Sequence, residues 1–178
     1  MHKLIPQCVI MLIVFLASEG RAQTLEQQRE TLRGLAGVAV VVEPLNAEAE
    51  QDGLQQRRLQ ATVEKQLRAA GIPVLSTETW SVTPGGPYLY VNVAALKKQY
   101  ELYAYSIEVC LNQLVTLARD RNIRQFAETW ETREVGTVGS DKLPTVQDSI
   151  ARHVETFIAA YRTVNPVRAE QLTLRLRP

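Results

Sequence analysis

The chain has few of the residue types on which many enzyme active sites and metal sites depend. Its 178 residues include two cysteines and two histidines, and aromatic residues make up 6% of the total. Cys8 lies in an N-terminal segment that we expect to be removed, so the mature protein would keep Cys110 alone and could form no internal disulfide. A domain of about 150 residues then has to be stabilised by its hydrophobic core, which is feasible at this size.

The chain also lacks an excess of charge of either sign. Lys and Arg number 20, against 19 Asp and Glu. Proteins that hold nucleic acid through its phosphates carry a basic surplus, so the composition argues against that class of partner. A hydrophobic content of 46% is typical of one ordinary globular domain.

The first 22 residues have the features of a secretory signal peptide. His2 and Lys3 precede an apolar run over residues 9–17, and Gly20 and Ala22 are small residues at the positions that a signal peptidase recognises. The run is shorter than the roughly 20 residues of a membrane-spanning helix. Cleavage near Ala22 is therefore favoured over a retained membrane anchor.

Cleavage would leave a formally neutral domain. It removes Lys3, Glu19 and Arg21, which leaves 18 basic and 18 acidic residues. Cys8 lies before the end of the apolar run and lacks the small residues directly upstream that lipoprotein processing requires. We therefore predict a periplasmic or secreted protein without a transmembrane segment, with one domain over 23–166 and a tail, either an edge strand or disordered, over 167–178.

Hydrophobic periodicity predicts the elements of this domain in the order β-α-β-β-β-β-α. Segment 24–33 is polar and could form a short helix or lead into the domain. An apolar, β-branched run predicts a strand within 37–44, and leucines at helical spacing predict a helix over 54–70 that ends at Gly71. The remaining predicted strands are 72–75, 88–94, 102–118 and 126–135, and the last helix covers 143–164.

The segment 102–118 shows two hydrophobic periodicities, one typical of a strand and one typical of a helix. Tyr103, Tyr105 and Ile107 begin a clean alternation that continues to Leu111, but several apolar residues between Ile107 and Ala118 also fit a helical stripe. Tyrosines and β-branched residues prefer a pleated surface, and no capping residue frames a helix here. We therefore predict a strand whose alternation buries one face against the helices and leaves a polar face with Ser106, Glu108, Asn112 and Thr116.

These elements predict an α+β fold of two layers, in which two amphipathic helices cover one face of a mainly antiparallel sheet. Strict alternation over 126–135 places Glu128 and Glu131 on opposite faces, which argues against a carboxylate pair. Cys110 is expected to be a small apolar side chain of the sheet, and His153 a residue on the polar flank of the last helix. No catalytic residue is predicted.

Two irregular segments supply the candidate contact residues for a ligand or partner. The loop 76–87 contains Trp80 and Thr83, and the glycine-bounded turn 136–142 contains Ser140, Asp141 and Lys142. Backbone N–H groups before a helix can bind an anion. The glycine spacing matches neither a P-loop nor a dinucleotide fingerprint, so no cofactor and no metal are predicted.

The chain resembles an uncharacterised family of bacterial secreted proteins. The segments that carry the resemblance are LRGLAGVAVVVEPL, LRAAGIPVLS, PYLYVNV, TVGSD and IARHVETFIAAYRTVNP. The order of elements is more loosely similar to periplasmic domains of the curli secretion channel, the peptidoglycan synthase activators and the N-terminal domain of the Tol-Pal translocation protein. That resemblance implies binding to another protein of the cell envelope, and it implies no activity.

Two hypotheses of function follow. The first is an exported, non-enzymatic interaction module that binds another envelope protein through a face or an edge of its sheet. The alternative is a small-ligand or hydrolytic site where the loop 76–87 meets the turn 136–141. A deep pocket that joins Trp80 to Ser140, Asp141 and Lys142 would favour the alternative.

Overall fold

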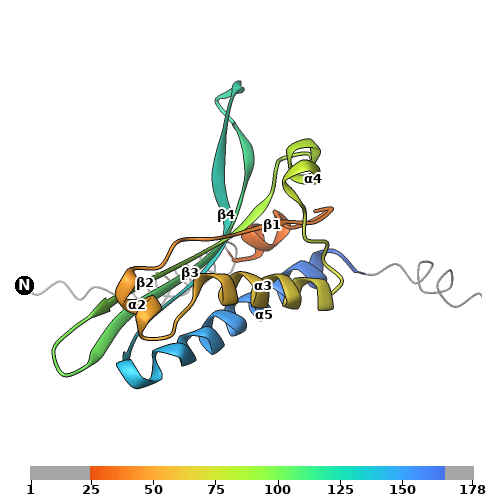
Figure 1. Ribbon diagram of the computed structural model, residues 1–178. Helices are drawn as coiled ribbons and strands as arrows, with labels where there is room; N and C mark the ends of the chain where they lie inside the picture. The colour runs from red at the N-terminus through yellow and green to blue at the C-terminus, as the bar shows by residue number, and fades with distance from the viewer. Residues whose placement is uncertain (1–24, 167–178) are drawn as a thin grey trace, which may run out of the picture.

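The computed structural model describes residues 25–166, which form an α+β fold around a four-stranded sheet (Figure 1). The strand order is β1-β2-β3-β4, with β1 parallel to β2 and the other neighbours antiparallel. The predicted fold class and the mainly antiparallel sheet are confirmed. The strands are β1 (Ala39–Val42), β2 (Tyr88–Lys97), β3 (Leu102–Leu117) and β4 (Asp120–Gly139).

Two long helices lie side by side on one face of the sheet (Figure 1). They are α3 (Gln56–Ala69) and α5 (Val146–Val164), close to the helices predicted from the sequence. Gly71 adopts a φ of 79° directly after the Ala70 cap of α3, as the sequence predicts for a helix terminus. The shorter helical elements are α2 (Ala47–Gln51), α4 (Thr77–Val82), the 3-10 helix η1 (Ser140–Thr145) and a turn of helix at 25–30.

β3 is a strand over nearly the whole segment for which two periods competed. Tyr103, Ile107, Val109 and Leu111 are buried towards the helices, together with the residues of β2 that pair with them. The helical interpretation is wrong, because the segment hydrogen-bonds as a strand to β2 on one side and to β4 on the other. The alternation was therefore the correct signal.

The predicted strand at 72–75 is wrong, so the sheet has four strands where five were expected. Val74 forms only an isolated parallel bridge with Val38. Pro73 accepts the Val38 N–H, and Leu75 donates back to the Val38 carbonyl, before the chain turns away at Ser76. Two backbone hydrogen bonds are too few to make a strand, but they place this segment beside the start of β1.

The loop 76–87 is also more regular than predicted. Ser76 and Thr79 form a reciprocal capping box at the start of α4. The signal for this helix was present in the sequence, but the short run TETWSV has too little hydrophobic periodicity to stand out. The Pro-Gly-Gly-Pro turn after it behaves as expected, with positive φ at Gly85 and Gly86.

β4 is longer at both ends than the strand predicted over 126–135. The turn between β3 and β4 consists of Ala118 and Arg119, and Asp120 already belongs to β4. At the other end, β4 continues through residues 136–139 before η1 begins. Gly139 occupies the N-cap position of η1, so no side chain caps this helix.

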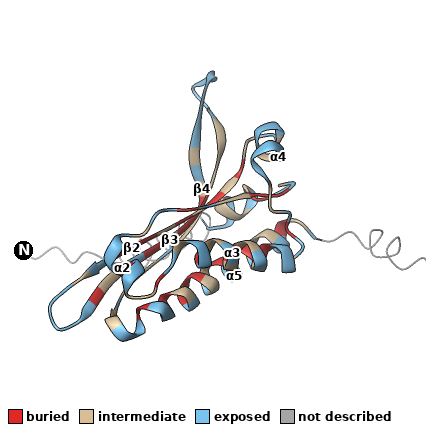
Figure 2. Ribbon diagram, viewed as in Figure 1, coloured by how far each residue is buried: buried red, intermediate tan, exposed pale blue. Residues whose placement is uncertain are grey.

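The outer half of the β3–β4 hairpin projects from the body as an arm (Figures 1 and 2). β2 pairs with β3 only as far as Asn112, so residues beyond it have β4 as their one strand neighbour. Residues 118–126 are all exposed. None of the helices between residues 25 and 166 combines the length and apolar character needed to cross a bilayer. The predicted signal peptide and tail lie outside the described residues.

Removal of the Phe157 side chain should strongly destabilise the fold. Phe157 is fully buried on α5 and packs edge-on against Trp130 of β4, with ring centroids 5.2 Å apart. Phe157→Ala should lower the free energy of unfolding by about 3–5 kcal/mol. Phe126→Ala is the matched control, since Phe126 is 45% exposed, and it should cost less than about 1.5 kcal/mol. Equal losses in urea unfolding would contradict this assignment of the core.

Candidate functional site

The edge of β1 leaves part of its backbone hydrogen-bonding capacity unpaired. Ala39 and Glu43 donate their N–H groups to β2, so the alternation of the ladder turns the backbone groups of Val40 and Val42 outwards. Neither outward N–H has a partner among residues 25–166. The segment that pairs with Val38 leaves this edge at Ser76, before it reaches Val40.

The outward carbonyl groups of the same edge are capped by side chains from α3. Gln60 donates its amide N–H to the Val40 carbonyl at 3.0 Å, and Gln56 donates to the Val42 carbonyl at 2.7 Å. Side-chain amides can be displaced by a backbone N–H at little cost, because one hydrogen bond replaces another. Along this edge, unpaired N–H groups therefore alternate with carbonyl groups whose glutamine partners a new strand could replace.

A groove of about 530 Å³ runs along this edge, and we call it the β1 groove. Gln60 and Glu64 of α3 line it on the helix side, and Trp80 and Tyr88 line it on the other. Its complete lining is Ala39, Val40, Val41, Gln60, Glu64, Val74, Leu75, Ser76, Thr77, Glu78, Trp80 and Tyr88. The charged residues in this lining are Glu64 and Glu78, so the groove is acidic.

Trp80 is fixed in place by an aromatic cluster at the base of the arm. Its ring stacks on Phe126, with centroids 6.2 Å apart and planes inclined by 22°, and meets Tyr88 edge-on at 6.5 Å. The backbone at Gly85 connects the same region to β3, because Leu114 donates its N–H to the Gly85 carbonyl. Trp80 is thus a rigid wall of the groove.

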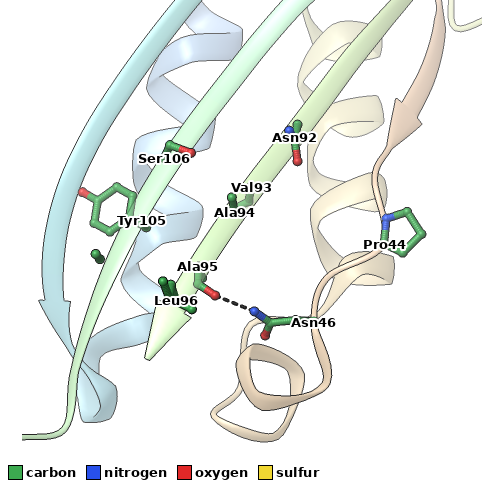
Figure 3. A pocket seen from close by; sticks show the side chains of 10 residues that line it. Pro44, Asn46, Asn92, Val93, Ala94, Ala95, Leu96, Tyr105 and Ser106 are labelled. Carbon is green, nitrogen blue, oxygen red and sulfur yellow. Dashed lines mark hydrogen bonds between the residues drawn. The ribbon is translucent and has the colours of Figure 1, made fainter. Parts of the chain in front are cut away.

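The face of the sheet opposite α3 and α5 carries exposed side chains such as Leu96 and Val135. A shallow hollow of about 610 Å³ lies on it, between β2, β3 and the segment after β1. Small side chains such as Ala94, Ala104 and Ser106 form its floor, and Asn46 closes one side with a hydrogen bond to the Ala95 carbonyl (Figure 3). The hollow contains no charged residue.

Glu128 and Glu131 share this open face, which corrects the prediction that they lie on opposite faces. The β3–β4 register shifts between Leu111 and Asn112, so that Leu111 pairs with Trp130 and Asn112 with Glu128. The extra residue reverses the alternation of β4 at this point. Partial burial and the neighbouring Glu131 carboxyl raise the pKa of Glu128.

Arg133 neutralises the acidic cluster that the bulge creates. Its guanidinium group lies 2.7 Å from Glu108, 3.2 Å from Glu128 and 2.6 Å from Glu131. Glu108, Cys110 and Glu128 bring their ligand atoms within 4.8 Å of one another. Burial and these glutamates raise the pKa of the Cys110 thiol to about 12, so the thiol stays protonated at neutral pH. Because Arg133 already pairs with Glu108 and Glu128, we assign no metal to this cluster.

His153 belongs to a polar network between β4 and α5 that the sequence did not reveal. Thr132 Oγ1 lies 2.9 Å from His153 Nδ1, and a Glu134 carboxylate oxygen lies 3.3 Å from Nε2. Tyr105 donates its hydroxyl to Glu134 at 2.8 Å, and this bond holds the pKa of Glu134 below its ordinary value. The His153 side chain is 11% exposed. Its contacts with Thr132 and Glu134 connect α5 to β4.

The five candidate contact residues do not converge. Trp80 lines the β1 groove, while Thr83 uses its hydroxyl to cap the last turn of α4 through the Thr79 carbonyl. Ser140 instead contacts Glu101 at the far end of β3, and the exposed Asp141 and Lys142 follow it in η1.

Ten residues of β3 separate the two groups, which is about 33 Å at the usual rise of a strand. The single site predicted between the loop 76–87 and the turn 136–141 is therefore not formed. Trp80 remains a candidate partner contact, now as a wall of the β1 groove.

No protein-family model matches the chain, and no curated protein matches it either. The resemblance to envelope proteins therefore stays an expectation from the sequence.

The Glu134 network should make stability depend on pH. The folded-state pKa of Glu134 lies below the ordinary 4.5, so the carboxylate stabilises the fold above that value. The contribution is lost as the pH falls through the folded-state pKa. Glu134→Gln should therefore reduce the free energy of unfolding at neutral pH, and the difference from wild type should shrink as the pH falls below 4.5.

Tyr105→Phe is the companion variant, because it removes the hydrogen bond that lowers the pKa most. It should weaken the same pH dependence while keeping the carboxylate. Urea unfolding at a series of pH values measures both effects. Parallel stability curves for wild type and Glu134→Gln would show that Glu134 contributes no such term.

Proposed function

We propose that the chain is an exported, non-enzymatic interaction module of the bacterial cell envelope that binds an extended segment of another protein along β1. Export rests on the signal-peptide pattern of residues 1–22. Binding rests on the geometry of the β1 groove, where a partner segment would add a fifth strand to the sheet.

The observation that carries this proposal is the incomplete ladder on β1. Residues 73–75 begin to pair with β1 at Val38 and then leave it, while Val40 and Val42 still direct their backbone groups outwards. An extended segment placed in line with Leu75 would continue the ladder that α4 interrupts. Its backbone would accept from the two free N–H groups and displace Gln56 and Gln60 from the carbonyl groups.

The two walls of the groove would select side chains. Successive side chains of a strand point to opposite faces, so alternate residues of the partner would face Trp80 and Tyr88, and the others Gln60 and Glu64. The first wall favours apolar side chains, and the second favours polar or basic ones. Main-chain pairing would supply affinity, and this alternation would supply specificity.

The reactive groups of the described residues support a binding role over a catalytic one. Cys110 is a protonated, buried thiol, Arg133 is engaged by three carboxylates, and His153 is enclosed between β4 and α5. Each group has its partners within the fold. The β1 groove, in contrast, has donors that the fold leaves without partners.

Val40→Pro should weaken the binding of extended peptides. The Val40 N–H does not serve the β1–β2 ladder, so proline at this outward position removes an edge donor and leaves the sheet paired. A displayed library of random ten-residue peptides would be selected on the wild-type protein, and the enriched peptides titrated against each variant. Binding to Val40→Pro should be at least about tenfold weaker, the equivalent of about 1.4 kcal/mol.

Val40→Ala is the matched control, because it truncates the same side chain but keeps the N–H, and it should retain peptide affinity within about threefold. Circular dichroism would verify that both variants fold. If Val40→Pro does not fold, Trp80→Ala tests the opposite wall and should also weaken binding. Enriched peptides whose affinity is unchanged by Val40→Pro and Trp80→Ala would overturn the proposal, as would the absence of any enriched peptide.

A further inference from the structure

The C-terminal residues 167–178 offer a ligand for the β1 groove within the chain itself. We propose that residues 172–177, the sequence LTLRLR, occupy the groove as a strand beside β1 and are displaced when a partner segment binds. This inference rests on the proposed function of the groove. It adds the chemistry of the preferred segment and a reason why the edge does not attract unrelated strands.

The end of α5 lies close enough to β1 for this contact. Asn165 accepts the Gly34 N–H on its side-chain oxygen at 2.7 Å, and Arg162 donates to the Ala70 carbonyl, so α5 ends beside the segment that leads into β1. Six residue steps separate Gly34 from Val40, which is at most about 22 Å. Seven steps separate Asn165 from Leu172 and can span up to about 25 Å, so residue 172 can reach Val40.

The direction of the chain fits the existing ladder. A segment that starts near Gly34 and runs towards Val42 is parallel to β1. The bridge between Val38 and Val74 is parallel as well, and so is the pairing of β1 with β2. The segment would therefore continue a parallel arrangement that is already present on both sides of β1.

The alternation of LTLRLR matches the two walls of the groove. Leu172, Leu174 and Leu176 would fall on one side of the strand, and Thr173, Arg175 and Arg177 on the other. The leucines suit the wall of Trp80 and Tyr88. The polar side chains suit the wall of Gln60 and Glu64.

The charges are complementary. The groove has two charged lining residues, Glu64 and Glu78, and both are acidic, while the segment carries two arginines and no acidic residue. Glu64 already accepts from Arg68 at 2.8 Å and from Gln60 at 2.6 Å, and the two oxygens of a carboxylate have lone pairs for about four donors. The Ser76 hydroxyl holds the pKa of Glu78 below its ordinary value, so Glu78 is ionised at neutral pH.

Occupation of the groove would protect an edge that otherwise invites aggregation. Unpaired strand edges are templates for other chains, and proteins commonly cover them. β1 is short, but Val40, with its outward N–H, lines the same groove as Trp80 and Tyr88, which is a favourable place for unwanted pairing. A covalently attached strand would hold the site at a high effective concentration until a better segment displaces it.

Hydrogen exchange of the full chain tests the proposal at the two amides concerned. The Val40 and Val42 amides should exchange at least about 100-fold more slowly than in an unstructured peptide. Leu174→Asp together with Leu176→Asp should speed their exchange by at least about tenfold, because two charges would face the aromatic wall. The Glu43 amide, which donates to Val91 of β2, should not change.

Leu174→Val together with Leu176→Val is the matched control, because it keeps the apolar alternation, and it should leave exchange within about threefold of wild type. Since β1 is identical in both double variants, their comparison separates occupation of the groove from simple burial of the amides. Unprotected Val40 and Val42 in the wild type, or equal exchange in the two variants, would overturn the proposal. Protection that rises with protein concentration would overturn it in favour of a second copy.

Peptide binding distinguishes failure of this inference from failure of the proposed function. If the tail occupies the groove, the library peptides should bind the aspartate variant at least about threefold more tightly than wild type, because they no longer compete with the tail. If only this inference is wrong, the peptides bind both proteins equally and stay sensitive to Val40→Pro. If the proposed function is wrong, no peptide responds to Val40→Pro in either background.

Discussion

The double pairing of β3 is the constraint on which the rest of the fold depends. β3 hydrogen-bonds to β2 from Tyr103 to Asn112 and to β4 along its whole length. Its buried alternate residues then dictate where α3 and α5 can pack, because only one face of the sheet is apolar. Since β2 is ten residues long and β3 sixteen, the outer part of the hairpin must leave the body as an arm. The base of that arm, where Phe126 meets Trp80, fixes one wall of the β1 groove.

This dependence explains which elements could be predicted from the sequence. A strand that pairs on both sides and is buried on one face shows strict alternation, and β3 does so from Tyr103 to Leu111. The amphipathic stripes of α3 and α5 follow from the same apolar face. The helical stripe that competed within β3 arose because its polar face also contains apolar residues, among them Cys110 and Leu114. The alternation identified the strand correctly, because Tyr103 and Tyr105 follow it together with the aliphatic residues.

The features that escaped prediction arise from contacts between residues distant in the sequence. The register shift at Asn112 depends on how β4 pairs with β3, and no residue of β4 indicates it in the sequence. It moved Glu128 to the side of Glu131 and so created the cluster around Arg133. The β1 groove was missed for a similar reason, because it exists only where residues 73–75 stop pairing with Val38. Trp80 was recognised as a candidate contact, but its partners Tyr88 and Phe126 come from two other elements.

The two ends of the sheet differ in how completely their polar groups are satisfied. At the η1 end, Ser140 bonds to Glu101, and Lys97 lies between Asp52 and Glu101, so these three charged residues are already paired. At the β1 end, backbone donors face a groove whose charged residues are both acidic. Val40 is only partly buried, so its outward donor bonds to water in the free protein and stays available to a partner strand. Binding at β1 would therefore replace water on a free backbone donor, whereas binding at the η1 end would have to break bonds within the protein that are already made.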